Sequence, residues 1–305
     1  MMSQETCLTH ICVTAILPGT CGELVQGTLD GVPCLVSCPI DRYSIAHIEL
    51  CPDPNWSVPH DAPKAAAALR AGLIYLGQTS WGGRLELDSD LPRGRGYASS
   101  TADVAATLYA LGEAVGRKLT DTEVARLAVG VEPSDSTIFP GLTLFDHRQG
   151  SFHEWWGDPP SAVVVVCDPG GEVDTLHFNR QDYVHALRLL VPWHREAFDL
   201  LRQGLQRGDL PTIGEAATIS AQAHQVVLPS VLLNRVLPLA REVGGVGVCR
   251  AHSGTISGIL LDPCTADISA VVAFLRRSLG ESIAVRAHRL VGGGPRMGEE
   301  NIATQ

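Results

Sequence analysis

The chain has 305 residues, of which 45% are hydrophobic and 18% are charged, and its formal net charge is -10. A chain of this length can bury enough apolar surface for two packed domains. The acidic balance, without a block of Lys or Arg, argues against nucleic acid as the main partner. No apolar run approaches the roughly 20 residues that a membrane span requires, so we expect no membrane partner.

The start of the chain has no basic leader and no small-residue cleavage site, which indicates a cytoplasmic protein. Nine cysteines and 11 histidines are present, but no CxxC or HExxH pattern occurs. Cys34 and Cys38 have a CxxxC spacing. We interpret the cysteines as thiols in a reducing compartment. The oligomeric state stays open between a monomer and a homodimer.

The first third of the chain is predicted to contain strands and then a helix. Residues 13–17 are apolar and partly β-branched, which is typical of a strand, and Pro18-Gly19 is expected to end it in a tight turn. Strands are expected to continue to about Leu50. Asp61 is the expected N-cap of the next helix, which has proline in its first turn and stops at Gly77.

A strand, a glycine loop and a helix are expected next, in that order. Residues 84–88 alternate between polar and apolar, which indicates a half-buried strand. Beyond the loop, the apolar stripe of an amphipathic helix is formed by Val104, Leu108, Leu111 and Val115. Thr120 and Glu123 form a capping box for a further helix that runs to Gly130.

The second half is predicted to begin with a buried strand. Residues 162–167 form a continuous apolar run that ends in Asp-Pro-Gly-Gly. We place the domain boundary just before this strand, which gives domains of residues 1–160 and 161–305.

Helices and strands are both expected in the second domain. Helical composition covers residues 183–202 and 213–240, and strands are predicted at residues 246–250, 259–261 and 283–291. Thr265 is expected to cap a helix that ends at Gly280. The tail after Val291 is expected to be mobile. Because strands and helices do not alternate strictly, the pattern is typical of an α+β protein.

The strongest chemical signal is the segment PRGRGYASSTA at residues 92–102. Glycines allow the backbone to approach a phosphate chain, and the following helix start presents unpaired N–H groups and the positive end of a dipole. The segment lacks the lysine of a Walker A motif, and its glycines do not form GxGxxG. Taken alone, it also fits a plain glycine turn whose Ser and Thr residues cap a helix.

PRGRGYASSTA resembles the second motif of the GHMP kinases, usually PxxxGLGSSAA. The resemblance implies ATP as cofactor, with nucleotide contacts from Pro92, Gly94, Arg95, Gly96, Tyr97, Ala98, Ser99, Ser100, Thr101 and Ala102. It also implies that Lys64 reaches nucleotide oxygens, near an adenine region around Asn55 and Asp61. The implied fold has two domains, the first similar to domain 2 of ribosomal protein S5 and the second ferredoxin-like.

Two further segments resemble family motifs at the expected order. LPGTCGE at residues 17–23 resembles the amino-terminal motif, which implies that Gly19 and Glu23 line the substrate side. RAHSGTISG at residues 250–258 resembles the glycine-rich third motif, which implies substrate contacts from Ser253 and Gly254. Residues 255–257 depart from that motif, because Thr, Ile and Ser stand where glycines are usual.

EPSD at residues 132–135 stands where the family has a metal-binding Glu and a catalytic Asp. Phosphoryl transfer requires one carboxylate to hold magnesium on the phosphates and another to orient or deprotonate the attacking hydroxyl. The resemblance therefore implies that Glu132 and Ser100 bind Mg²⁺ and that Asp135 is catalytic and faces the acceptor. The tetrapeptide alone would also be an ordinary turn.

Within the family, PGTCGELVQG, GYASSTADV and GVEPSDSTIFPGL resemble the members that phosphorylate L-threonine. This implies that the product is O-phospho-L-threonine, which feeds the aminopropanol linker of coenzyme B12 in cobalamin synthesis and propanediol utilisation. Two alternatives stay open. One is a homoserine kinase or another metabolite kinase of this family, and the other is a catalytically silent nucleotide sensor with the same fold.

Overall fold

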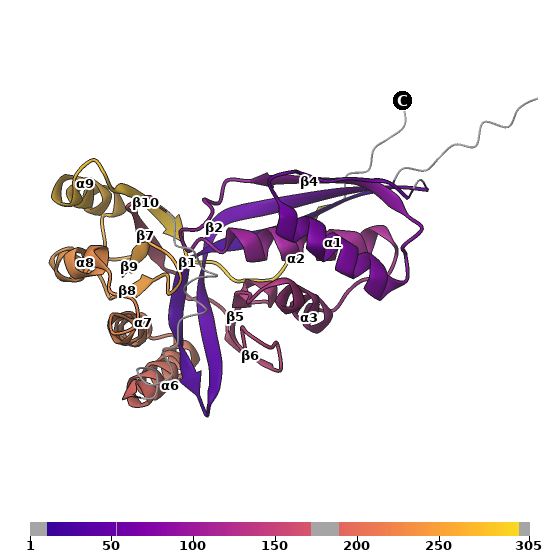
Figure 1. Cartoon of the computed structure of the whole chain (residues 1–305). Helices are drawn as coiled ribbons and strands as arrows, with labels where there is room; N and C mark the ends of the chain where they lie inside the picture. Colours follow the sequence, from indigo (N-terminus) through magenta and orange to yellow (C-terminus); the bar gives the residue numbers. More distant parts are fainter. Residues whose placement is uncertain (1–10, 53, 172–188, 299–305) are drawn as a thin grey trace, which may run out of the picture.

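The computed structural model describes residues 11–52, 54–171 and 189–298, and it has the mixed α+β architecture that the sequence predicts (Figure 1). The first part contains the following elements in chain order: β1 (Ile11–Leu29), β2 (Val32–Cys51), β3 (Trp56–Ser57), α1 (Pro63–Leu76), β4 (Gly82–Ser89), α2 (Ser99–Ala114), α3 (Asp121–Val131), the short 3-10 helix η1 (Ser136–Ile138), β5 (Leu142–Phe145) and β6 (His153–Gly157). Helices α1, α2 and α3 gather on one side of the β1–β2–β4 sheet.

A long antiparallel hairpin of β1 and β2 forms the spine of the molecule. The predicted tight turn at Pro18-Gly19 is wrong, because β1 continues through it and the register shifts between Pro18 and Val25. These bulges bend the strand without ending it, since bulges absorb extra residues in one strand of a pair. Gly22 adopts a φ of 60°, which suits the irregular backbone.

The helices of the first part differ from the sequence predictions in two ways. Ala62 occupies the N-cap of α1 and no side chain caps it, so Asp61 lies outside the helix, whereas Gly77 ends it with a φ of 67° as expected. Helix α2 is buried on nearly every side rather than on one stripe, because α1, α3 and the sheet all pack against it. The capping box of Thr120 and Glu123 at the start of α3 is confirmed.

The second part has a ferredoxin-like order of elements. It contains β7 (Val163–Asp168), α6 (Val191–Arg207), α7 (Leu210–His224), α8 (Val231–Glu242), β8 (Gly247–Arg250), β9 (Ser257–Leu261), α9 (Ile268–Leu279) and β10 (Ala284–Arg289). Its strands lie in the order β10-β7-β9-β8, and β8 joins β1 of the first part through Glu23 and Arg250. A β-α-β-β-α-β chain with this strand order is the ferredoxin-like motif. The domain boundary at residues 160 and 161 falls between β6 and β7 and stays a prediction.

Two details of the second part correct the sequence analysis. The helical stretch at residues 213–240 is two helices, α7 and α8, and the side chain of Ser230 caps the second by accepting from the N–H of Leu233. Asp267 rather than Thr265 caps α9, through its bond with the N–H of Ala270 at 3.0 Å. The helix start predicted at residue 183 lies outside the described residues.

The segment after Val291 is ordered as far as residue 298, contrary to expectation. The N–H of Gly293 donates to the carbonyl of Gly141 at 2.9 Å, and that of Gly294 donates to Thr137 at 2.8 Å. Strand β11 (Arg296–Gly298) then pairs with β1. Glycines make this possible, because a Cβ at Gly293 would lie 2.4 Å from the carbonyl oxygen of Phe139.

The structure shows no disulfide bond among the residues that it describes. Across the same residues, no helix combines the length and apolarity that crossing a membrane requires.

The contact between α7 and β8 depends on a missing side chain, which gives a stability prediction. A Cβ at Gly214 would lie 2.2 Å from the carbonyl oxygen of Val246. We expect Gly214→Ala to lower the free energy of unfolding by about 1–3 kcal/mol, as overpacking does. Gly130→Ala in α3 is the matched control, because nothing lies within 4 Å of its Cβ position. At Gly130, alanine should raise the free energy of unfolding by roughly 0.5–1 kcal/mol. Urea denaturation measures both, and equal changes would contradict the packing argument.

Candidate active site

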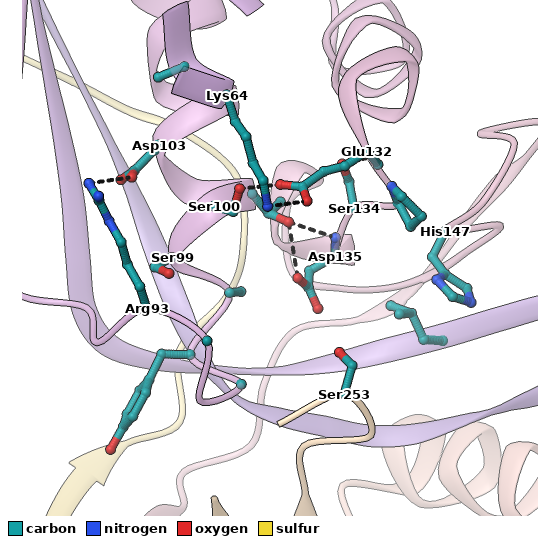
Figure 2. Close-up of a pocket in the computed structure, with 18 of the residues that line it drawn as sticks. Lys64, Arg93, Ser99, Ser100, Asp103, Glu132, Ser134, Asp135, His147 and Ser253 are labelled. Carbon is teal, nitrogen blue, oxygen red and sulfur yellow. Dashed lines mark hydrogen bonds and ion pairs between the residues drawn. The ribbon is translucent and has the colours of Figure 1, made fainter. Parts of the chain in front are cut away.

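A cavity of about 380 Å³ opens at the start of α2, between the two parts of the molecule (Figure 2). The glycine loop, the start of α1 and the end of α3 border it, and β1, the β5–β6 hairpin and the β8–β9 loop contribute further residues. The cavity is lined by these residues implied by sequence: Glu23, Asp61, Lys64, Gly94, Gly96, Tyr97, Ala98, Ser99, Ser100, Thr101, Glu132, Asp135 and Ser253. Pro92, Arg95, Ala102, Gly19 and Gly254 lie outside the lining.

The glycine loop ends in a left-handed backbone that aims the start of α2 at the cavity. Gly94, Gly96 and Ala98 have φ values of 69°, 99° and 55°. No side chain caps α2 at Ala98, so the first N–H groups of the helix face the cavity without a capping partner. A helix start of this kind attracts an anion through its N–H groups and its dipole.

Backbone contacts from the other two motif segments hold this loop. The N–H groups of Thr20 and Gly22 donate to the carbonyls of Tyr97 and Gly96, both at 3.0 Å. On the other side, the N–H of Thr255 donates to the carbonyl of Arg95 at 2.9 Å. Gly19 and Gly254 pack against the same loop, since a Cβ at either would lie 2.3 Å from Leu91 or Arg95 respectively. These two glycines therefore border the loop rather than the cavity.

Two bulky residues of the loop, Arg95 and Tyr97, contact the second part of the molecule. Arg95 forms an ion pair with Asp168 of β7 at 3.2 Å, and the Tyr97 hydroxyl donates to the same carboxylate at 3.2 Å. Burial and the charge of Asp168 raise the pKa of Tyr97. The polar ends of these side chains are thus engaged with β7.

Glu132 lies at the end of α3, where it meets residues from two other helices. The hydroxyl of Ser100 in α2 donates to one oxygen of its carboxylate. The ammonium of Lys64 in α1 lies 2.5 Å from the other oxygen. Three residues far apart in sequence therefore meet at the start of α2, as Figure 2 shows.

Asp135 lies beside this group and is held by Thr101. The Thr101 hydroxyl donates to its carboxylate at 3.0 Å and accepts from its backbone N–H at 3.1 Å. Burial raises the pKa of Asp135 to about 6, and the charge of Glu132 adds to this effect against the hydrogen bonds from Thr101 and Ser37.

Glu23 forms a second buried carboxylate on the β1 side of the cavity. It accepts a hydrogen bond from the backbone N–H of His252 at 2.9 Å. Burial, reinforced by the charge of Asp135, raises its pKa well above the usual range. A carboxyl group therefore lines the cavity on the side of β1.

The cavity also contains residues that motif reading missed. Arg93, inside the recognised loop, pairs with Asp61 at 3.3 Å and with Asp103 at 4.0 Å. Because Arg93 is a basic residue within the glycine loop, the sequence could have identified it as a candidate site residue. Gln26 and Ser134 lie inside recognised segments but had no assigned role, and three lining residues lie outside every recognised segment, namely Leu35, His147 and Arg148. Asn55, expected near the nucleotide, lies outside the lining.

Comparison with known proteins identifies relatives of the chain. Residues 63–139 match the family described as GHMP kinases N terminal domain. The chain is 33% identical over 255 residues to the L-threonine kinase of Salmonella typhimurium strain LT2, with 83% of this chain and 84% of that protein covered.

Solved structures with low sequence identity share the fold. Homoserine kinase from Cytophaga hutchinsonii superposes with a TM-score of 0.73 at 18% identity, over 97% of this chain and 99% of that one. The structure of MDDEF in complex with MVAPP, AMPPCP and magnesium has a TM-score of 0.72 at 15% identity, over 96% and 100% of the chains. The fold class predicted from the resemblance is confirmed. Since a curated relative is one-third identical across most of both chains, this chain belongs to the GHMP kinase family of phosphotransferases.

Proposed function

We propose that the protein transfers the γ-phosphate of ATP to the hydroxyl of L-threonine and so makes O-phospho-L-threonine. The observation that carries the proposal is the convergence of Ser100, Glu132 and Asp135 at the uncapped start of α2. Phosphoryl transfer is catalysed mainly by positioning and by neutralising charge. A helix start that binds anions, beside two carboxylates, supplies both the positioning and the means of neutralising charge.

The loop end of the cavity is suited to the triphosphate of ATP. The first turn of α2 offers N–H groups together with the hydroxyls of Ser99 and Ser100. Lys64 and Arg93 add positive charge at the same end. These are the donors that phosphate oxygens require.

The donor set at Glu132 fits Mg²⁺. Magnesium prefers oxygen ligands and usually takes only one or two from the protein, the rest coming from water and phosphates. The carboxylate of Glu132 and the hydroxyl of Ser100 are such ligands and lie in contact. Bound there, the ion would neutralise charge on the phosphates of the nucleotide.

Asp135 has the role of orienting and deprotonating the acceptor hydroxyl. Thr101 fixes its carboxylate through two hydrogen bonds. A pKa of about 6 leaves Asp135 ionised at neutral pH yet basic enough to take a proton. A protein that only sensed nucleotide would have no use for this carboxylate.

L-threonine is the proposed acceptor because the curated relative named above is an L-threonine kinase. Glu23, from the amino-terminal motif, lines the acceptor side of the cavity. In this role the protein would supply the precursor of the aminopropanol linker of coenzyme B12. The shared fold with a homoserine kinase makes L-homoserine the acceptor to test against.

The deciding experiment incubates purified protein with Mg-ATP and a panel of hydroxylated amino acids. ADP release and product mass identify both the reaction and the acceptor. Threonine-dependent ADP release with phosphothreonine as product supports the proposal. Nucleotide binding without ADP release from any acceptor would favour the silent sensor.

Glu132→Gln tests the metal assignment, because it keeps the shape of the side chain and removes its charge. We expect turnover to fall by orders of magnitude and the Mg²⁺ requirement to rise. Ser100→Ala should change both in the same direction but less. Steady-state rates across a magnesium titration measure the effect. If the rate and the magnesium dependence were unchanged, the assignment of Glu132 as a metal ligand would be wrong.

Asp135→Asn tests the base. We expect kcat to fall to near zero while ATP affinity is largely kept, since the interaction is used in the transition state. In the wild type, kcat/KM should fall as the pH drops through about 6, because protonation at the raised pKa removes the base. Residual activity of the variant should lack this decline. Loss of nucleotide binding would give Asp135 a different role.

The order of kcat/KM among three acceptors follows from the methyl group and from the position of the hydroxyl. Serine lacks only the methyl group, which is worth about 10- to 200-fold in kcat/KM in an apolar pocket. Homoserine carries its hydroxyl one carbon further out, and a misplacement of about 1 Å can cost on the order of 100-fold. We expect threonine to exceed both in kcat/KM under one Mg-ATP condition. If homoserine were the best substrate, the assignment of threonine as acceptor would be wrong, and the assignment of kinase activity would stand.

A further inference from the structure

We infer that Arg148 binds the carboxylate of the acceptor, so that the cavity selects the zwitterion of an α-amino acid. This inference rests on the proposed function and specifies its acceptor site. It concerns a residue that lies in none of the family-like motifs, at the end of the cavity away from the glycine loop.

The charges of the cavity are paired at one end and unpaired at the other. Lys64 contacts Glu132 at 2.5 Å, and Arg93 contacts Asp61 at 3.3 Å. Arg148, the third cation of the lining, forms no ion pair with any residue that the structure describes. Its guanidinium is therefore available for an anionic ligand.

A carboxyl group that lines the cavity also lacks an ion pair. Glu23 forms no ion pair within 4.0 Å in the described part of the chain, because the guanidinium of Arg250 binds Gln225 and the carbonyl of Leu228 instead. Glu23 and Asp135 are close enough for the charge of one to raise the pKa of the other. The guanidinium of Arg148 matches the carboxylate of an amino acid, and the carboxyl oxygens of Glu23 can accept hydrogen bonds from its ammonium.

A rigid turn presents Arg148. Asp146 follows β5 and is fully buried, and its carboxylate accepts hydrogen bonds from the backbone of residues 148, 149 and 151 and from the Ser151 hydroxyl. Gly150 completes the turn with a φ of 64° and donates to the carbonyl of Asp146. The backbone of Arg148 is thus fixed before any ligand binds, which lowers the entropy lost on binding.

The neighbours of Arg148 agree with this position. His147 lines the cavity, and the charge of Arg148 helps to lower its pKa, which burial lowers most, to about 4. In Figure 2, His147 lies at the opposite end of the site from Arg93 and Asp103, with Asp135 between them. A carboxylate held near His147 would leave the rest of the amino acid extending toward Asp135.

The remaining lining supplies the other contacts of a small amino acid. Leu35, on β2, is buried and apolar and pairs with Phe145 next to the Asp146 turn. It offers a surface for a methyl group. The guanidinium of arginine binds a carboxylate through two parallel hydrogen bonds, which fixes orientation as well as affinity.

The test compares each amino acid with its amide, which keeps the ammonium and the hydroxyl but removes the negative charge. The substrates are L-threonine, L-threoninamide, L-homoserine and L-homoserine amide, each with Mg-ATP. The proteins are the wild type, Arg148→Gln, Arg148→Lys and the control Arg126→Gln. Arg126 is an exposed residue of α3 outside the cavity lining. Thermal melting confirms that each variant is folded.

We expect the wild type to prefer threonine to its amide by about 10- to 100-fold in kcat/KM, the range for a hydrogen bond to a charged group. Arg148→Gln should raise the KM for threonine by that factor, keep kcat and leave the amide unchanged. Arg148→Lys should restore part of the preference, because it keeps the charge without the paired hydrogen bonds. Arg126→Gln should behave as the wild type.

Three results would overturn the inference while the kinase stands. These are equal use of acid and amide by the wild type, an equal loss on both substrates in Arg148→Gln, and no loss on either. If homoserine is preferred with the same dependence on Arg148, the acceptor changes and the inference holds. If no amino acid is phosphorylated, both the proposed function and the inference are wrong.

Discussion

The site depends on three backbone segments that pack directly against one another. Gly22, Gly96 and Gly254 each lie so close to a neighbouring segment that a Cβ would come within 2.3 Å of an atom in it. Because no side chains separate them, hydrogen bonds link β1 and the β8–β9 loop to the two sides of the glycine loop. The two parts of the molecule therefore meet at the start of α2, and the cavity forms where they join.

This junction explains why acidic groups can lie close together in a partly buried site. Glu132 and Asp135 follow α3, whereas Glu23 comes from β1, so separate elements fix each carboxylate. Burial raises the pKa of Asp135 and of Glu23, and the negative charge of a neighbouring carboxylate raises each further. Such an arrangement costs stability and favours cationic ligands, which is the usual compromise of a catalytic site.

The departures of this chain from the GHMP motif pattern have structural explanations. Arg95 and Tyr97 both bind Asp168, so they tie the glycine loop to β7 of the second part. In the third motif, the N–H groups of Thr255 and Ile256 donate to the carbonyl of Arg95. The larger side chains are tolerated there because the β8–β9 loop supports the glycine loop through these hydrogen bonds. Ser253 is the residue of the β8–β9 loop that lines the cavity.

Local patterns in the sequence determined the elements whose signals are short in range. The capping box of α3, the Gly77 stop and the apolar run of β7 all act between near neighbours, and motif resemblance identified the loop, Glu132 and Asp135. Tertiary structure alone decided the continuation of β1 through Pro18, the burial of α2 on all sides and the pairing of β11. It also brought Arg148 from the β5–β6 turn to the cavity that the glycine loop borders. These features depend on contacts between residues far apart in the chain, which no local pattern encodes.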